Sequence, residues 1–242
     1  MDSNGQTTGG SAVHNTTFAR AGIIGLGLIG GSIARALQSR AGIPVVGLDI
    51  DGSVIEAALG EGVLAGGRVI SPDDGDAAVV DQGAWHLLHD CDVVFVCAPA
   101  HAVPRLVRLA AGFCPGLMTD VASVKQPIMD QIDLDRFIGG HPMAGSERQG
   151  YPFSSETLLE NAVYVLCLHP ETQLAYATLR KFEALIRLIG ATPVILDAAE
   201  HDRAVAAVSH LPHVAASALS LLAARSDEGS LARLAAGGFR DI

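Results

Sequence analysis

The sequence predicts an α/β fold, in which a doubly wound, mostly parallel sheet is followed by a small all-helical module. From residue 21 onward, short apolar segments of strand length alternate with helical patterns, which is typical of a parallel sheet with helices on its faces. After residue 197 this alternation stops, and the Ala-rich segment 198–225 is too long and too strongly helical for a further βα unit. We therefore expect a flexible tail at residues 1–18, an α/β domain at 19–196 and a helical module at 197–242.

The apolar segments predict seven strands, with helical patterns between them. The strands are expected at residues 21–25, 45–49, 93–98, 117–120, 137–139, 162–168 and 192–196. In residues 174–189 the apolar side chains recur every three or four positions, and Gly190 follows as a helix stop. Residues 60–83 are acidic and rich in glycine, which predicts a loop with at most one weak strand.

Composition excludes several classes of function. The formal net charge is −10, whereas proteins that bind a nucleic-acid backbone present a basic surface. Hydrophobic residues make up 49% of the chain, which is enough for a packed core. We expect no apolar run of the ~18 uncharged residues that a membrane span requires, and residues 1–18 lack the order of a secretory signal. The four cysteines form no CxxC pair and are expected to be free thiols. These features predict a cytoplasmic protein without nucleic-acid or membrane partners.

The segment GLGLIG at residues 25–30 directly follows the first predicted strand and opens a helix. Gly25 permits a tight turn, Gly27 lets the backbone approach a pyrophosphate, and Gly30 lets helix and strand pack closely. The N–H groups at the start of the helix, around Leu28 and Ile29, would face the phosphates together with the positive end of the helix dipole. A Rossmann-type dinucleotide site is therefore expected, with a glycine-rich turn that binds nothing as the alternative.

Two further strand ends extend this predicted cofactor site. The second strand ends at Asp49, 19 residues after Gly30, where a carboxylate can accept a hydrogen bond from a ribose 2′-hydroxyl. The same charge would repel a 2′-phosphate, and no arginine follows directly, so NAD is favoured over NADP. Ala98 and Pro99 lie at the end of another strand, where the chain would run beside the nicotinamide ribose.

Hydride transfer from a carbinol requires a group that accepts the hydroxyl proton. His141 is the first candidate, because it follows the strand at 137–139 in a loop of small residues and a proline that would let the ring project into a cleft. A solvated surface histidine is the alternative. Ser123, in the segment DVASVK, ends the preceding strand at the same edge and could hydrogen-bond to this histidine, or could act as a helix N-cap.

A second pair of histidines lies in the helical module. His210 and His213 are three residues apart in SHLPH, so they share one helix face, and Pro212 should kink the helix or mark its restart. A metal site is disfavoured because no nearby carboxylate completes a ligand set, and the wall of a polar pocket is the better interpretation. The remaining histidines are expected at the surface, and they are His14, His86, His89, His101, His169 and His201.

Five segments in this order resemble the prephenate/arogenate dehydrogenases of tyrosine biosynthesis. They are GLGLIGGSIA, the strand that ends at Asp49, DVASVK, GGHPMAGSE and AVSHLPH, and the resemblance covers residues 21–242. It implies NAD-dependent oxidative decarboxylation of a cyclohexadienyl carboxylate, with hydride leaving ring C4 and His141 accepting the hydroxyl proton. It also implies that Ser123 orients His141 and reaches the substrate and nicotinamide, and that the chain dimerises through its helical domain. The residues implied to border the substrate are Ser146, Glu147, Ser209, His210 and His213.

The sequence departs from the family pattern at its end. GGFRDI at residues 237–242 resembles a segment that normally continues into Thr-Arg, whose arginine binds a substrate carboxylate. The chain ends about two residues short of that position, so the helical module is expected to be incomplete, with Arg240, Arg148 or Lys125 as candidate substitutes. A related dehydrogenase acting on an amino-substituted prephenate or a β-hydroxyacid, or a catalytically inactive NAD-binding module, are the alternative functions.

Overall fold

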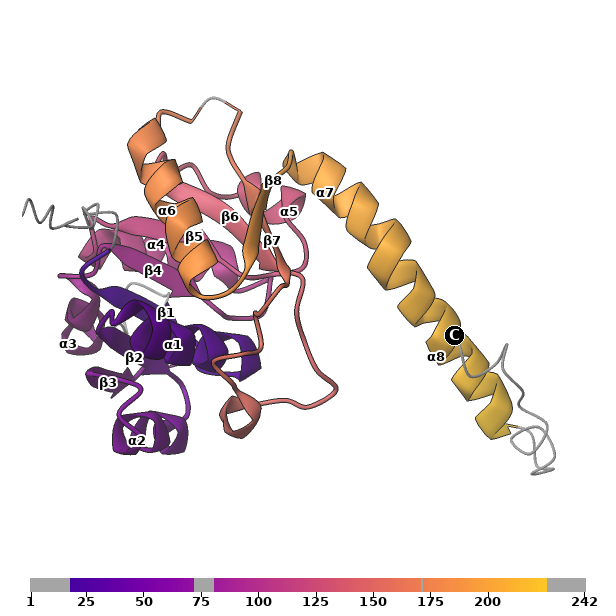
Figure 1. Cartoon of the computed structure of the whole chain (residues 1–242), viewed down its shortest axis with the longest axis horizontal. Helices are drawn as coiled ribbons and strands as arrows, with labels where there is room; N and C mark the ends of the chain where they lie inside the picture. The colour runs from indigo at the N-terminus through magenta and orange to yellow at the C-terminus, as the bar shows by residue number, and fades with distance from the viewer. Residues whose placement is uncertain (1–17, 72–80, 171, 226–242) are drawn as a thin grey trace, which may run out of the picture.

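The computed structural model describes residues 18–71, 81–170 and 172–225, and it places eight strands in one sheet (Figure 1). Their order across the sheet is β3-β2-β1-β4-β5-β6-β7-β8. All neighbouring pairs are parallel except β6 and β7, which are antiparallel. This confirms the predicted fold class. The strands are β1 (Ala21–Ile24), β2 (Val45–Asp49), β3 (Gly66–Val69), β4 (Val93–Val96), β5 (Leu117–Asp120), β6 (Phe137–Pro142), β7 (Val163–Cys167) and β8 (Thr192–Ile195).

Helices cover both faces of the sheet. One face carries α1 (Leu28–Ala41), α2 (Gly52–Gly60) and α6 (Tyr176–Leu188), and the other carries α3 (Gln82–Trp85), α4 (Val103–Phe113) and α5 (Gln126–Met129). Two short 3₁₀ turns, η1 (His86–Leu88) and η2 (Tyr151–Phe153), complete the α/β part. Strand β4 shows why two cores form: Val93 and Phe95 enter one apolar cluster, whereas Val94 and Val96 enter the other. A strand such as β4 is apolar at every position because both faces of the sheet are buried there.

Most predicted elements lie where the pattern placed them, and the differences have local causes. The weak strand of residues 60–83 is β3, whose Gly67 leaves room for Ile55, since a Cβ there would lie 2.8 Å from that side chain. Strand β6 runs to Pro142, three residues further than expected, because β7 pairs with it along its whole second half. Phe18, placed in the tail, is buried against Phe182. Residues 1–17 lie outside the described part of the chain.

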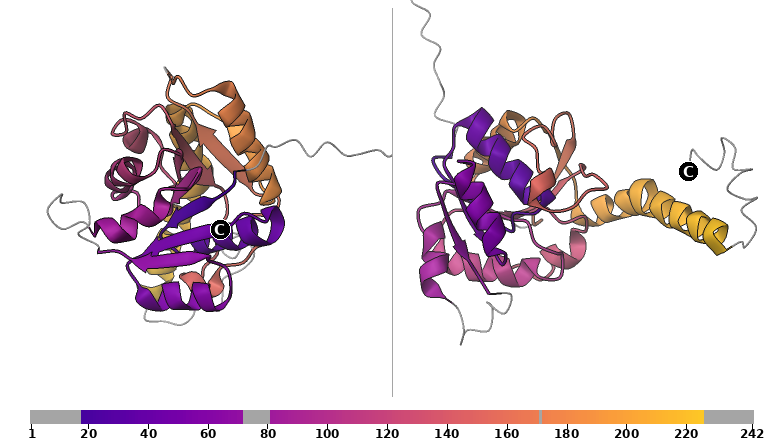
Figure 2. Two further views of the ribbon diagram at one scale, coloured as in Figure 1. Left: turned by 90° about the vertical axis from the view of Figure 1, so that its left-hand side faces the viewer. Right: turned by 90° about the horizontal axis from the view of Figure 1, so that it is seen from below.

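A long helical segment leaves the α/β domain after β8 (Figures 1 and 2). It consists of α7 (Ala198–Val205), a π-helical turn η3 (Ala206–His210) and α8 (Leu211–Arg225), which confirms the predicted helix over residues 198–225. The π turn ends at His210, two residues before Pro212, which has no N–H to donate, and the α-helix resumes at Leu211. The domain boundary near residue 196 stays a prediction.

Most of this helical segment is exposed. Val205 is buried, but Val208, Leu211, Val214, Leu221 and Leu222 are between 61% and 70% exposed. Within Ala198–Leu222 an 18-residue window has a mean hydropathy of 1.5, so the helix is long and apolar enough to cross a membrane by length and composition alone. The expectation that no such run exists was therefore wrong, because residues 204–224 contain no Asp, Glu, Lys or Arg. An exposed apolar surface of this kind is typical of a site that contacts another protein or a membrane.

Candidate active site

The glycine-rich turn between β1 and α1 has the geometry that a bound phosphate requires. Gly25 has a φ of 91°, and a Cβ there would lie 2.5 Å from the carbonyl oxygen of Cys97. A Cβ on Gly30 would lie 1.9 Å from the carbonyl oxygen of Gly25, so only glycine lets helix and strand approach this closely. At Gly27, the residue that precedes α1, a Cβ would meet no atom within 4 Å. The start of α1 is therefore open on the side where its N–H groups point.

Two adjoining cavities follow the carboxyl ends of the strands, where the order of the sheet reverses between β1 and β4. One, of about 410 Å³, lies beside Asp49, Ala98 and Pro99. The other, of about 510 Å³, is lined by Leu28, Ile29, Ala98, Pro99, Ser123, Ser146 and Arg148 among others. Gly27, Ala98 and Pro99 line both, so the two cavities form one elongated crevice across the glycine turn.

Asp49 closes one end of this crevice. Its Oδ2 accepts a hydrogen bond from the backbone N–H of Leu26 at 2.5 Å, and its Oδ1 accepts one from the N–H of Asp51 at 2.9 Å. These two bonds fix the carboxylate at the end of β2, one residue before the exposed Ile50, while each oxygen keeps a further lone pair. The carboxylate is therefore held in place as a hydrogen-bond acceptor for a ligand hydroxyl.

A buried ion pair joins the ends of β5 and β6. Asp120 and Lys125 have fully buried side chains that bond to each other, and the ammonium also donates to the carbonyl of Gly140 at 2.6 Å. Asp120 in turn accepts from the N–H groups of Gly140 and Ala122, each at 3.0 Å. Burial raises the pKa of Asp120 and lowers that of Lys125, and the attraction between the two charges opposes both shifts. Lys125 is therefore a structural cation and not the substrate-binding cation that the sequence suggested.

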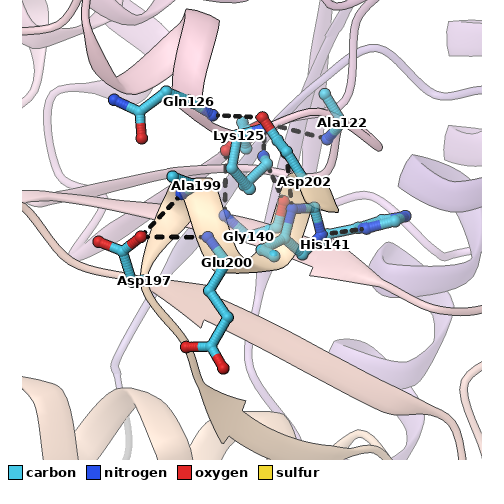
Figure 3. Close-up of polar contacts among 11 residues, drawn as sticks. Ala122, Lys125, Gln126, Gly140, His141, Asp197, Ala199, Glu200 and Asp202 are labelled. Atoms are coloured by element: carbon cyan, nitrogen blue, oxygen red, sulfur yellow. Dashed lines mark hydrogen bonds and ion pairs between the residues drawn. The ribbon is translucent and has the colours of Figure 1, made fainter. Parts of the chain in front are cut away.

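His141 lies in β6, directly after Gly140, and is only 8% exposed. The sequence placed it in a loop, with a surface residue as the alternative; the extended ladder with β7 buries it instead. Figure 3 labels His141 together with Gly140, Lys125 and Asp202. Nδ1 of His141 lies 2.8 Å from Nε2 of His201, with the two rings edge to face. Burial, followed by the proximity of His201 and Lys125, lowers the pKa of His141 to about 4. The imidazole is consequently neutral at physiological pH.

His201 and Asp202 are the site residues that sequence reasoning missed. His201 was expected at the surface, but it lies in the first turn of α7 and is fully buried, between His141 and Asp202. No local pattern marks this contact, because it joins residues that lie 60 positions apart. The only available signal was the His-Asp dipeptide shortly after Asp197, which caps α7. Of the other predicted surface histidines, His86, His89 and His101 are exposed and His169 is half-buried, while His14 lies outside the described residues.

The remaining candidates lie at the rim of the crevice or on the long helix. Ser123 is exposed, and within the described ranges no hydrogen bond joins it to His141. It is not the N-cap of α5 either, because the carboxylate of Asp202 accepts the N–H groups there. Ser146 and Glu147 are exposed beside the second cavity. Ser209, His210 and His213 are exposed on η3 and α8, and His210 lies close enough to His141 to contribute to its lowered pKa.

No metal centre is found among the residues that the structure describes, since no three His, Cys, Asp or Glu side chains lie close enough together to hold an ion. All four cysteines are free thiols, and three of them are buried. Arg148 lines the second cavity and remains exposed, with its guanidinium over the ring of Phe153. Arg240 and the GGFRDI segment lie beyond the described residues.

The glycine turn, the fixed carboxylate at the end of β2 and the crevice at the reversal of strand order define a Rossmann-type nucleotide-binding domain. Comparison with known families identifies it further. Residues 33–195 match the nucleotide-binding domain of prephenate dehydrogenase, and residues 197–242 match the prephenate dehydrogenase dimerization domain. The chain belongs to the prephenate dehydrogenase family, as the resemblance of its motifs implied.

Individual relatives agree with this assignment. Prephenate dehydrogenase of Bacillus subtilis is 33% identical over 91% of this chain, which spans 58% of that relative's length. Among solved structures, Synechocystis arogenate dehydrogenase is 30% identical, with a TM-score of 0.73 over 92% of this chain and 77% of the other. Prephenate dehydrogenase from A. aeolicus, in complex with hydroxyphenyl propionate and NAD+, is 25% identical, with a TM-score of 0.75 over 92% and 76% of the two chains.

The buried ion pair makes a specific prediction about stability. Lys125→Met should lower the free energy of unfolding by about 3–5 kcal/mol, because it leaves the Asp120 carboxylate buried without its counter-charge. Arg40→Met removes the partly exposed partner of Glu160 and should cost no more than about 1 kcal/mol. Urea unfolding of both variants at neutral pH measures the difference. Equal losses of unfolding free energy in the two variants would show that the buried pair contributes no more to stability than the partly exposed one.

Proposed function

We propose that this chain catalyses the NAD-dependent oxidative decarboxylation of prephenate or arogenate, with His141 as the acceptor of the substrate hydroxyl proton. The observation that carries the proposal is the neutral, buried His141 at the carboxyl end of β6, next to the strand end that leads into the crevice. Neutral histidine is the usual proton acceptor near physiological pH. In the cell, we place this reaction in the biosynthesis of tyrosine in the cytoplasm.

The crevice fits NAD. The open start of α1 at Gly27 would receive the pyrophosphate, and the fixed carboxylate of Asp49 would accept a ribose hydroxyl while disfavouring a 2′-phosphate. Ala98, Pro99 and Ser123 line the end of the crevice that would hold the nicotinamide. When bound, NAD supplies the acceptor for the hydride. The protein's part is to hold ring C4 near that acceptor and to provide the hydrogen-bonding partner of the hydroxyl.

The proposed reaction balances without a net proton. Hydride leaves C4, the C1–carboxylate bond breaks to release CO₂, and its electron pair enters the ring, which becomes aromatic. The hydroxyl oxygen of the substrate becomes the phenol oxygen of the product. His141 therefore accepts the hydroxyl hydrogen bond and holds the proton while the C4–O bond gains double-bond character, and the proton returns to oxygen as the ring aromatises. Aromatisation and CO₂ release make the step downhill.

The helical segment supports a homodimer. Residues 197–242 match a domain named for dimerization, and the apolar side chains of η3 and α8 are exposed in the single chain. A second copy of the same segment would cover them, because an isologous contact pairs one surface with itself. In this arrangement Ser209, His210 and His213, together with Ser146 and Glu147, are proposed to border the substrate. The choice between prephenate and arogenate depends on contacts to the side chain of the substrate.

Turnover tests the proposal directly. The protein incubated with NAD and either prephenate or arogenate should produce NADH, and His141→Asn should lower kcat by about 10²–10⁴-fold because the proton acceptor is lost. NAD binding by calorimetry should be unchanged in this variant. Binding of NAD without turnover of either acid would identify an inactive module, and turnover of a β-hydroxyacid alone would identify a different dehydrogenase. Full activity in His141→Asn would exclude this histidine as the acceptor.

The lowered pKa of His141 predicts the pH dependence of the reaction. Only the neutral ring can accept a proton, and a pKa of about 4 in place of 6.5 keeps the ring neutral at lower pH. Activity is therefore lost only as the pH falls toward about 4. The value of kcat/KM should stay level from pH 8 down to about pH 5, with folding monitored by circular dichroism at each pH. If kcat/KM of the folded protein instead falls with a midpoint near pH 6.5, the lowered pKa of His141 would be contradicted.

A further inference from the structure

We propose that His201 and Asp202 are positioning residues for His141: Asp202 sets the tautomer of His201, and His201 sets that of His141. The three side chains form a continuous hydrogen-bonded series across two elements, from α7 to β6. Oδ1 of Asp202 lies 2.8 Å from Nδ1 of His201, and Nε2 of His201 lies 2.8 Å from Nδ1 of His141. This inference rests on the proposed role of His141 as the acceptor.

The direction of each hydrogen bond follows from the ionised carboxylate at one end. Partial burial opposes ionisation of Asp202, but the N–H groups of Lys125 and Gln126, followed by His201, outweigh it and hold the pKa of Asp202 below its usual value. A carboxylate can only accept, so Nδ1 of His201 carries the hydrogen. In neutral His201, Nε2 is then the acceptor, and Nδ1 of His141 must donate to it. Nε2 of His141 is left with its lone pair.

The free nitrogen of His141 is suited to bind a substrate hydroxyl. Within the described residues, Nε2 of His141 has no hydrogen-bond partner, and it is not among the buried polar atoms that lack one, so it stays accessible. The other groups that act electrostatically on this ring are Lys125, which is paired with Asp120, and His210 on η3. Neither supplies a second hydrogen bond to the ring. His201 is therefore the side chain that fixes both its orientation and its protonated nitrogen.

Asp202 is itself held rigidly. Its two oxygens accept from the backbone N–H groups of Lys125 at 2.7 Å and Gln126 at 2.9 Å, at the start of α5. A carboxylate fixed by three hydrogen bonds allows His201 little freedom to rotate. When the substrate hydroxyl shares its proton with Nε2 of His141, positive charge develops on that ring. The negative charge of Asp202, which opposes the lowering of the His141 pKa, then helps to stabilise that charge through the hydrogen-bonded series.

A matched pair of variants separates this role from a structural one. In Asp202→Asn the amide oxygen can still accept from the N–H of Lys125 and from Nδ1 of His201, but the negative charge is lost, so the hydrogen on Nδ1 of His201, and through it that on Nδ1 of His141, is held less strongly. We expect kcat to fall about 10²-fold with little change in KM. Asp197→Asn makes the same charge change on the same helix, where Asp197 caps α7 through the N–H groups of Ala199 and Glu200. Asparagine also caps helices well, so this variant should keep full activity.

A second pair of variants tests the acceptor at position 201. His201→Gln keeps an amide oxygen that can accept from Nδ1 of His141, whereas His201→Phe keeps the bulk but no acceptor. We expect the Gln variant to retain more of kcat than the Phe variant. Equal and large losses accompanied by loss of the folded near-ultraviolet dichroism would identify a packing role instead, and would overturn the proposal.

The tautomer itself can be observed without turnover. Nitrogen-15 chemical shifts of the His141 ring at neutral pH should show hydrogen on Nδ1 in the wild type and in Asp197→Asn, and a larger share of hydrogen on Nε2 in Asp202→Asn. Hydrogen on Nε2 in the wild type overturns the proposal whatever the activity. If His141→Asn abolishes turnover while Asp202→Asn and His201→Phe keep it, the positioning role fails and the proposed function stands. If the wild type turns over neither acid, the proposed function fails, and the chemical shifts still decide the tautomer.

Discussion

The buried ion pair between Asp120 and Lys125 is the interaction on which the candidate site depends. Removing two charges from water costs several kcal/mol per ion, and here the loss is offset by their mutual attraction and by hydrogen bonds to both the N–H and the C=O of Gly140. Because Gly140 precedes His141, the pair fixes the backbone that carries the proposed acceptor. The backbone N–H of Lys125 is bound by Asp202 from α7. Lys125 therefore connects β5, β6 and the helical segment.

This arrangement explains how two modules can share one site. The α/β part supplies the glycine turn, the fixed Asp49 and His141, whereas α7 supplies His201 and Asp202. The contact between them is polar and partly buried, and it ties the first turn of α7 to the start of α5, near the point where the long helix leaves the sheet (Figure 2). The exposed apolar side chains further along η3 and α8 are those that the proposed second copy would cover. The proposed roles in catalysis and in assembly therefore fall on the same helical segment.

The sequence predicted the fold because its signals are local. Apolar runs, the positive-φ turn at Gly25 and the helix stop at Gly190 act over a few residues, and each was read from its neighbours. Long-range packing was not predictable in this way. The length of β6 depends on an antiparallel partner that begins after residue 160, and the burial of His201 depends on where α7 packs. Lys125 was misjudged for the same reason, since only the folded chain brings Gly140 to its ammonium.

The central claim is that Nε2 of His141 meets the substrate hydroxyl while Nδ1 stays bonded to His201. A crystal structure of this protein with NAD and a hydroxyphenyl propionate tests it most directly. We predict the phenol oxygen within about 2.6–3.2 Å of Nε2, with the contact between His141 and His201 retained. A phenol oxygen bound elsewhere, with the His141 ring turned away from His201, would contradict the account.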